Sequence, residues 1–264
     1  MTMKKAFLFL CLLCVPFLIQ AQTRVNASEI VAKINSGEAV SYKNTEIVGD
    51  LDMTQLKNMK LENEPENKYS TREFISTVTA PITFVNCTFK GDVLAYFNPD
   101  NKNVKLLNSN KKNEVYNTNF EKAVRFENCV FEGATAFKYS KFKEDVSFAG
   151  SSFQHEALFK YSKFSRSADF SNARFGDVGN FKYVTFPQTS SFESASFRRE
   201  ANFKYAKFDK DANFARASFR GLANFKYTKV ANNMDLQKAV FDGEEDFKYT
   251  QVNNRKTSRA DLVN

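Results

Sequence analysis

A large apolar residue returns at alternating steps of five and six residues over about half of the sequence. Residues 126–252 hold 24 such positions, of which 21 are Phe and the others are Val230, Leu236 and Val252. A longer period is superimposed, because the triplet Phe-Lys-Tyr returns at a constant interval, beginning at Phe137, Phe159, Phe181, Phe203, Phe225 and Phe247. Such regularity is typical of repeat proteins, in which each unit packs on the next.

The spacing argues against long helices and long flat strands. On an α-helix, steps of five and six residues would place the Phe side chains on two separate stripes. The residue two positions before each large residue is usually small, as at Ala157, Ala173 and Ala201. Residues two apart on a strand share a face. The sequence therefore predicts short strands that each send one small and one large side chain inward, with four sides in a coil of about 22 residues.

One frame is repeated with particular clarity. Ala212-Asn213-Phe214, Ala217-Ser218-Phe219 and Ala223-Asn224-Phe225 all follow the pattern Ala-x-Phe-x-x. This pattern resembles the pentapeptide-repeat family, over about half of the chain. The resemblance implies an all-β fold, a right-handed four-sided parallel β-helix (a solenoid). The sixth residue on alternate sides departs from the family's pattern and predicts a longer corner or a bulge. A three-sided or irregular β-solenoid is the alternative fold.

Residues 1–21 have the pattern of a secretory signal peptide. Lys4 and Lys5 form a basic start, the run from Ala6 to Ile19 is apolar, and Ala21 is a small residue before a cleavage point. The apolar run is short for a membrane span. We therefore expect an exported chain, periplasmic or extracellular. Removing Lys4 and Lys5 lowers the formal net charge from +8 to +6, which permits but does not require an anionic partner.

The rest of the sequence divides into a cap, a solenoid and a tail. Ser28 is the predicted N-cap of a short amphipathic helix that ends at Gly37 and covers the apolar end of the solenoid. The repeat spacing also appears in fragments before residue 126, separated by two polar stretches. The predicted segments are an N-terminal cap helix at 22–39, a β-helix at 40–252 with insertions near 57–80 and 96–114, and a C-terminal cap or tail at 253–264.

Two columns of side chains accompany the repeat and form the candidate binding site. Each Phe of the triplet is followed by Lys and Tyr, and a coil of this constant length would align each column along one face. We call these residues the Lys/Tyr ladder: Lys138, Lys160, Lys182, Lys204, Lys226, Lys248, Tyr139, Tyr161, Tyr183, Tyr205, Tyr227 and Tyr249. Like charges repeated at about 4.8 Å repel one another. The ladder would therefore gain from an anionic polysaccharide, a lipid head group or an acidic protein.

The alternative interpretation of the ladder is a solvated face that is partly paired with nearby carboxylates. Surface ion pairs of that kind contribute little stability each, and repetition alone can copy a residue into every coil. The candidate carboxylates on the following side are Glu144, Asp145, Asp169, Asp209, Asp211 and Asp235.

The remaining reactive side chains do not form a catalytic or metal-binding pattern. His155 is the single His and is expected to face solvent. Cys87 and Cys129 take positions where Ala is usual, so we expect buried core residues rather than a disulfide. No cofactor is expected.

The expected function is that of a non-enzymatic exported scaffold that uses the Lys/Tyr ladder to bind an anionic partner. The alternatives are a self-assembling rod, which would be a homo-oligomer, a protein-interaction module, and a polysaccharide-active enzyme. Some pentapeptide-repeat proteins mimic DNA, which requires an acidic surface and a cytoplasmic location. This chain is basic and carries an export pattern, so we do not expect a nucleic-acid partner.

Overall fold

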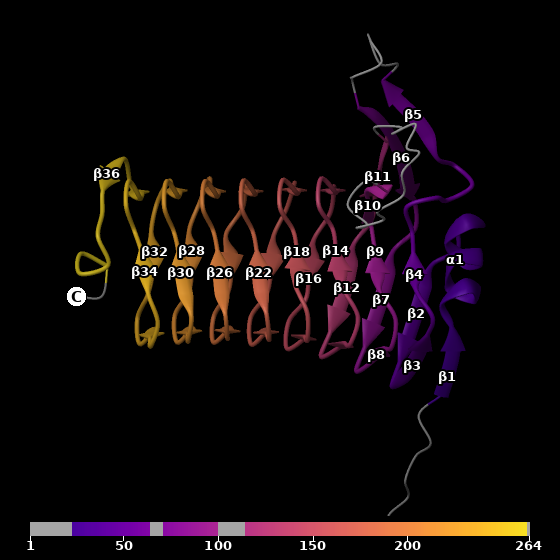
Figure 1. The fold of residues 1–264 in the computed structure, drawn as a ribbon, viewed down its shortest axis with the longest axis horizontal. Coiled ribbons are helices and arrows are strands. Elements are labelled where there is room, and N and C mark those ends of the chain that lie inside the picture. Colours follow the sequence, from indigo (N-terminus) through magenta and orange to yellow (C-terminus); the bar gives the residue numbers. More distant parts are fainter. Residues whose placement is uncertain (1–22, 64–70, 100–113, 263–264) are drawn as a thin grey trace, which may run out of the picture.

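Short strands alternate with tight corners and stack into a straight rod (Figure 1). The computed structural model describes residues 23–63, 71–99 and 114–262. The signal peptide expected at 1–21 lies outside these residues. The strands form four sheets that run the length of the rod, and almost all neighbouring strands are parallel. The predicted all-β parallel β-helix is confirmed, and equivalent residues of successive repeats lie side by side, as Phe131 does beside Phe153.

We number the four sheets as faces in the order in which each coil from β2 onward passes through them. Face 1 contains β2 (Val40–Lys43), β7 (Ile82–Val85), β12 (Val124–Glu127), β16 (Val146–Ser147), β20 (Ala168–Asp169), β24 (Ser190–Ser191), β28 (Ala212–Asn213) and β32 (Met234–Asp235). Face 2 contains β1 (Thr23–Asn26), β3 (Thr45–Val48), β8 (Thr88–Phe89), β13 (Val130–Phe131), β17 (Ser152–Phe153), β21 (Arg174–Phe175), β25 (Ser196–Phe197), β29 (Ser218–Phe219) and β33 (Val240–Phe241).

Faces 3 and 4 complete each coil. Face 3 contains β4 (Leu51–Asp52), β9 (Val93–Leu94), β14 (Thr135–Ala136), β18 (Ala157–Leu158), β22 (Val178–Asn180), β26 (Glu200–Asn202), β30 (Leu222–Asn224) and β34 (Glu245–Asp246). Face 4 contains β5 (Lys60–Asn63), β6 (Arg72–Val78), β10 (Tyr96–Phe97), β11 (Glu114–Phe120), β15 (Lys141–Phe142), β19 (Lys163–Phe164), β23 (Thr185–Phe186), β27 (Lys207–Phe208), β31 (Lys229–Val230), β35 (Gln251–Val252) and β36 (Arg255–Lys256).

The interior of the rod is a continuous array of Phe rings. Within a column, the rings of successive coils stack parallel to one another and offset, as Phe181 does on Phe203 with centroids 5.0 Å apart and planes 4° apart. Between columns, rings meet edge to face, as Phe181 and Phe192 do at 5.1 Å and 82°. Both geometries suit the quadrupole of an aromatic ring. The small residues at the preceding inward positions, such as Ala157 and Ala201, are fully buried and leave room for these rings.

A single helix of the described chain covers the N-terminal end of the rod (Figure 1). Helix α1 (Ala27–Asn35) buries Ala27, Ile30 and Ile34 against the first coil. The predicted N-cap at Ser28 is wrong, because Asn26 occupies the N-cap position. The reason is that β1 runs directly into the helix and stacks on β3, so the helix begins earlier than predicted.

Two coils are longer than the others and build a projecting sheet. Strand β11 lies beside β6 and pairs Glu114 with Arg72. These two residues are much farther apart in the sequence than the paired residues of the regular coils, such as Phe131 and Phe153. The extra residues lie at the predicted insertions, and their described parts are ordered strands: β5 pairs antiparallel with β6, and β10 with β11. We call these four strands the wall. Figure 1 shows the wall rising above the upper edge of the rod at its N-terminal end.

The C-terminal segment folds back on the last strand of face 4. Strand β36 pairs antiparallel with β35, and Arg259 forms an ion pair with Glu245 at 3.0 Å. The last strands of the other three faces, β32, β33 and β34, have no following strand in the described part of the chain. Three of the four sheets therefore end with one unpaired strand edge.

Candidate functional site: the Lys/Tyr ladder

The Lys/Tyr ladder lies at the corner where face 3 turns into face 4. In each coil the chain passes this corner through a four-residue turn, in which the N–H of Ser140 donates to the carbonyl of Phe137 at 3.1 Å. All six ladder tyrosines have positive φ, between 60° and 63°. Turns with a positive φ at the third position usually place Gly or Asn there. A tyrosine in this conformation is unusual and strained, so its repetition requires compensating contacts.

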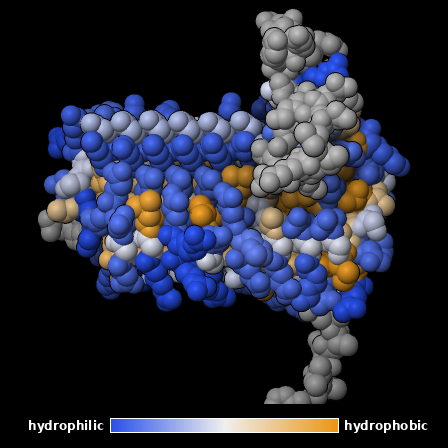
Figure 2. Space-filling model, viewed as in Figure 1, coloured by the Kyte–Doolittle hydropathy of each residue, from blue (hydrophilic) through white to orange (hydrophobic). Residues whose placement is uncertain are grey.

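Stacked rings provide that compensation. The six tyrosines form one column in which neighbouring centroids lie 4.7–5.0 Å apart, and the rings of Tyr205 and Tyr227 are parallel. The rings lie at the edge of the rod, and Tyr183 and Tyr205 are each 38% exposed. The upper edge of the rod in Figure 2 carries a straight row of weakly polar side chains beside a strongly hydrophilic row, the pattern that stacked Tyr and Lys columns produce.

Each ladder lysine packs across its neighbouring tyrosine. The Nζ atoms lie 4.8–5.7 Å from the ring centroids of the tyrosines that follow them in sequence. This cation–π geometry holds the ammonium groups in one row. Below them, the side chains of Asn180, Asn202 and Asn224 accept hydrogen bonds from the backbone N–H of Lys182, Lys204 and Lys226. The ladder therefore aligns its cations in a row with the spacing of the coils.

Few carboxylates pair with this row. Among the described residues, one ladder lysine forms an ion pair: the Nζ of Lys226 lies 4.0 Å from Oδ2 of Asp246. The carboxylates named as candidate partners lie elsewhere: Glu144 pairs with Lys122, and Asp209 pairs with Lys207. Lys207 belongs to a second, exposed column on face 4 with Lys141, Lys163 and Lys229. Most of the ladder lysines therefore form no ion pair within the described residues.

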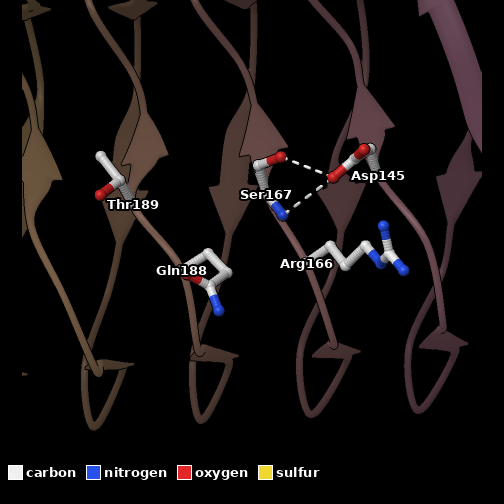
Figure 3. Close-up of a pocket in the computed structure, with 5 residues that line it drawn as sticks. All are labelled: Asp145, Arg166, Ser167, Gln188 and Thr189. Carbon is white, nitrogen blue, oxygen red and sulfur yellow. Dashed lines mark hydrogen bonds between the residues drawn. The ribbon is translucent and has the colours of Figure 1, made fainter.

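One hollow lies away from the ladder, at the corner where face 4 turns into face 1. It has a volume of about 450 Å³ and is lined by Asp145, Arg166, Ser167, Gln188 and Thr189 (Figure 3). Asp145 accepts hydrogen bonds from both the backbone N–H and the hydroxyl of Ser167. The carboxylate is therefore already engaged in closing the corner, and the hollow holds no nucleophile–base pair.

The other reactive side chains also have structural positions. Cys87 and Cys129 are free thiols, each 1% exposed, which confirms the core prediction. Hydrogen bonding with Cys87, followed by burial, raises the pKa of the Cys129 thiol. His155 is exposed, as expected. Within the described residues no group of three or more His, Cys, Asp or Glu side chains could hold a metal ion, and no helix is long and apolar enough to cross a membrane.

Sequence reasoning missed the wall's contribution to the ladder. Tyr96, in the predicted second insertion, lies beside Tyr139 with the centroids 6.0 Å apart. The Nζ of Lys138 lies 4.6 Å from the Tyr96 centroid and donates to its hydroxyl at 3.1 Å. The wall therefore closes the N-terminal end of the ladder. Only the aromatic pair Tyr96-Phe97 beside a polar stretch could have suggested an ordered element there.

Comparison with known proteins agrees with this geometry. A family model described as pentapeptide repeats (9 copies) matches residues 116–163, 159–207 and 203–251. Neither the curated proteins nor the solved structures gave a match. The matched residues span just over half of the chain and coincide with the regular coils that carry the ladder. The chain belongs to the pentapeptide-repeat family.

Proposed function

We propose that this protein is an exported, non-enzymatic scaffold that binds an acidic polysaccharide along the Lys/Tyr ladder. Pentapeptide-repeat proteins are generally structural or interaction scaffolds, which is the broader role that family membership supports. The observation that carries the proposal is the ladder itself: six lysines, held over six stacked tyrosines, with little internal charge pairing.

The electrostatics favour an extended polyanion. Two unit charges about 4.8 Å apart repel by roughly 0.9 kcal/mol in water and by about four times as much near a protein surface. A linear polyanion would relieve this repulsion at every rung and release counterions, so its affinity should fall steeply with salt. A straight row of cations fits a linear chain better than a planar membrane, and the adjacent tyrosines suit the apolar faces and hydroxyls of sugars.

The test compares two variants of equal charge. In the ladder variant, Lys160, Lys182, Lys204 and Lys226 become Gln. In the control variant, four basic residues on or beside face 2 become Gln: Arg174, Arg198, Arg220 and Lys238. Binding to polygalacturonate is measured for the chain without residues 1–21, at about 0.05 M and 0.5 M salt.

We expect salt-sensitive binding that the ladder variant loses and the control variant keeps. Equal losses in both variants would mean that net charge, rather than the ladder, attracts the polymer. Absence of binding by the wild type would reject the proposal, and turnover of the polymer would support a polysaccharide-active enzyme instead. Secretion of the full chain, with cleavage near residue 21, is measured separately by mass spectrometry of the culture medium and periplasm.

A second candidate function is self-assembly, because three sheets end in unpaired strands at the C-terminal end of the described rod. Val240 on β33 is 50% exposed there, and Phe241 is only half-buried. Stacking of one rod on another would cover this end. Light scattering would then show concentration-dependent oligomers that Val240→Lys disrupts and the ladder variant leaves unchanged.

A further inference from the structure

A pocket of about 430 Å³ lies where the Lys/Tyr ladder meets the wall. Its lining includes Glu73 and Asn117 from the wall, Tyr96, and Lys138 and Tyr139 from the first rung of the ladder. This volume falls within the usual range of small-molecule sites. Figure 1 shows the wall strands β6, β10 and β11 at the N-terminal end of the rod, next to the first regular coils, so the ladder meets the wall at one end only.

The wall side of the pocket carries hydrogen-bond acceptors. Asn117 is 1% exposed, and its Nδ2 donates to Oε1 of Glu73 at 2.6 Å. Its Oδ1 has no hydrogen-bond partner among the described residues. A buried acceptor without a partner is costly, and a ligand hydroxyl would satisfy it. The half-buried carboxylate of Glu73 is a second acceptor beside it.

The ladder side of the pocket carries a cation and a ring. The Nζ of Lys138 lies 4.6 Å and 4.8 Å from the centroids of Tyr96 and Tyr139, so it contacts both rings. One of its hydrogens is directed to the Tyr96 hydroxyl, and the others are available to an anion. The inner rings of the ladder have both faces covered by stacked neighbours. Tyr139 differs, because Tyr96 meets it at an angle of 57° rather than stacking on it.

We infer that this pocket binds one uronic-acid sugar, the end unit of the acidic polysaccharide proposed for the ladder. The sugar hydroxyls donate to Asn117 Oδ1 and Glu73, the carboxylate pairs with Lys138, and an apolar sugar face packs on Tyr139. The inference rests on the proposed function only for the part of the polymer that lies along the ladder. Binding of the single end unit in the pocket does not depend on it. The inference also implies that the polymer binds the ladder in one orientation, because only one end of the bound polymer reaches the pocket.

The experiment uses two matched substitutions in the full scaffold without residues 1–21. Tyr139→Ala and Tyr249→Ala each remove a terminal ring of the same stack, at positions with the same φ of 63°, but only Tyr139 lines the pocket. Asn117→Leu removes the unpartnered acceptor, with circular dichroism as the check on folding. The probes are galacturonic acid, its hexamer, and poly-L-glutamate of equal charge, measured by ligand-observed NMR.

We expect the hexamer to bind more tightly than poly-L-glutamate, and Tyr139→Ala and Asn117→Leu to lower its affinity roughly three- to tenfold. Tyr249→Ala, at the opposite end of the ladder, should lower that affinity less than Tyr139→Ala does, because it leaves the pocket intact. If Asn117→Leu does not fold, the comparison of Tyr139→Ala with Tyr249→Ala is the deciding measurement. Equal binding of both polymers, untouched by Tyr139→Ala, would overturn the pocket while the ladder function stands. Binding of galacturonic acid alone, without either polymer, would keep the pocket and reject the ladder function. No binding of any probe would overturn both.

Discussion

Replacing Tyr205 with Gly tests why tyrosine occupies the corner between faces 3 and 4. Tyr205 has a φ of 61°, a conformation that costs an L-residue about 1–2 kcal/mol. Glycine removes that strain but loses about 0.5–1 kcal/mol more conformational entropy on folding. The backbone alone therefore predicts a change between neutral and a stabilisation of about 1.5 kcal/mol.

The ring contacts act in the opposite direction. Tyr205 stacks on Tyr183 at 4.8 Å and on Tyr227 at 4.7 Å, and the Nζ of Lys204 lies 5.5 Å from its centroid. Aromatic pairs contribute about 0.5–1.5 kcal/mol each, and an exposed cation–π contact adds about 0.5–1 kcal/mol. The lost contacts exceed the relieved strain, so we expect Tyr205→Gly to destabilise the protein by about 2 kcal/mol.

Lys238→Gly is the matched control. Lys238 lies at the corner between faces 1 and 2 with a φ of 59°, and within the described chain its side chain contacts no aromatic ring. The substitution Lys238→Gly should therefore leave the stability unchanged or raise it slightly. Urea unfolding followed by circular dichroism measures both variants. If Tyr205→Gly were as stable as the wild type, the tyrosine stack could not be what offsets the strain of the corner.

Three further predictions concern the core and one partly buried acid. Phe181→Ala should cost about 3–5 kcal/mol in urea unfolding, because this fully buried ring packs between two stacked rings at 5.0–5.1 Å; a loss below about 1 kcal/mol would contradict that packing. Burial and then Glu156 raise the pKa of Glu200. The wild type therefore loses stability as pH rises through that pKa, and Glu200→Gln should be more stable by less than about 1 kcal/mol at neutral pH. This gain should vanish in acid, so a difference that is independent of pH would refute it. The thiols of Cys87 and Cys129 should resist a thiol reagent until the chain unfolds, and rapid labelling of the native protein would show that the coils open locally.

Local repetition explains why so much of the fold could be predicted. Because each coil contacts only its neighbours, the alternation of Phe every five and six residues defines the inward positions directly. Phe181 and Ala201 are therefore buried as the spacing predicts. The two cysteines could be placed in the core for the same reason, since each stands two positions before an inward Phe. At Ser28 the prediction failed because strand β1 fixes where the helix begins.

The wall and its pocket could not be predicted, because they depend on contacts between segments without a repeat. Asn117 lies beside Ile75 in one strand pair and beside Tyr96 in the other. No spacing in the sequence indicates either pairing. The same holds for the positive φ of the ladder tyrosines, because tyrosine has no intrinsic preference for that conformation.

The sequence by itself therefore determined the coil, the Phe core and the alignment of lysines and tyrosines into columns, since these follow from the constant interval between Phe-Lys-Tyr triplets. The tertiary structure alone decided how those columns pack: the tyrosine rings stack parallel to one another, and the lysines lie across them with little internal charge pairing. It also decided that the ladder ends against the wall, at Glu73 and Asn117. The physical reason is that a period specifies which side chains are neighbours, whereas ring orientation, charge pairing and the docking of irregular strands depend on the three-dimensional contacts of the folded chain.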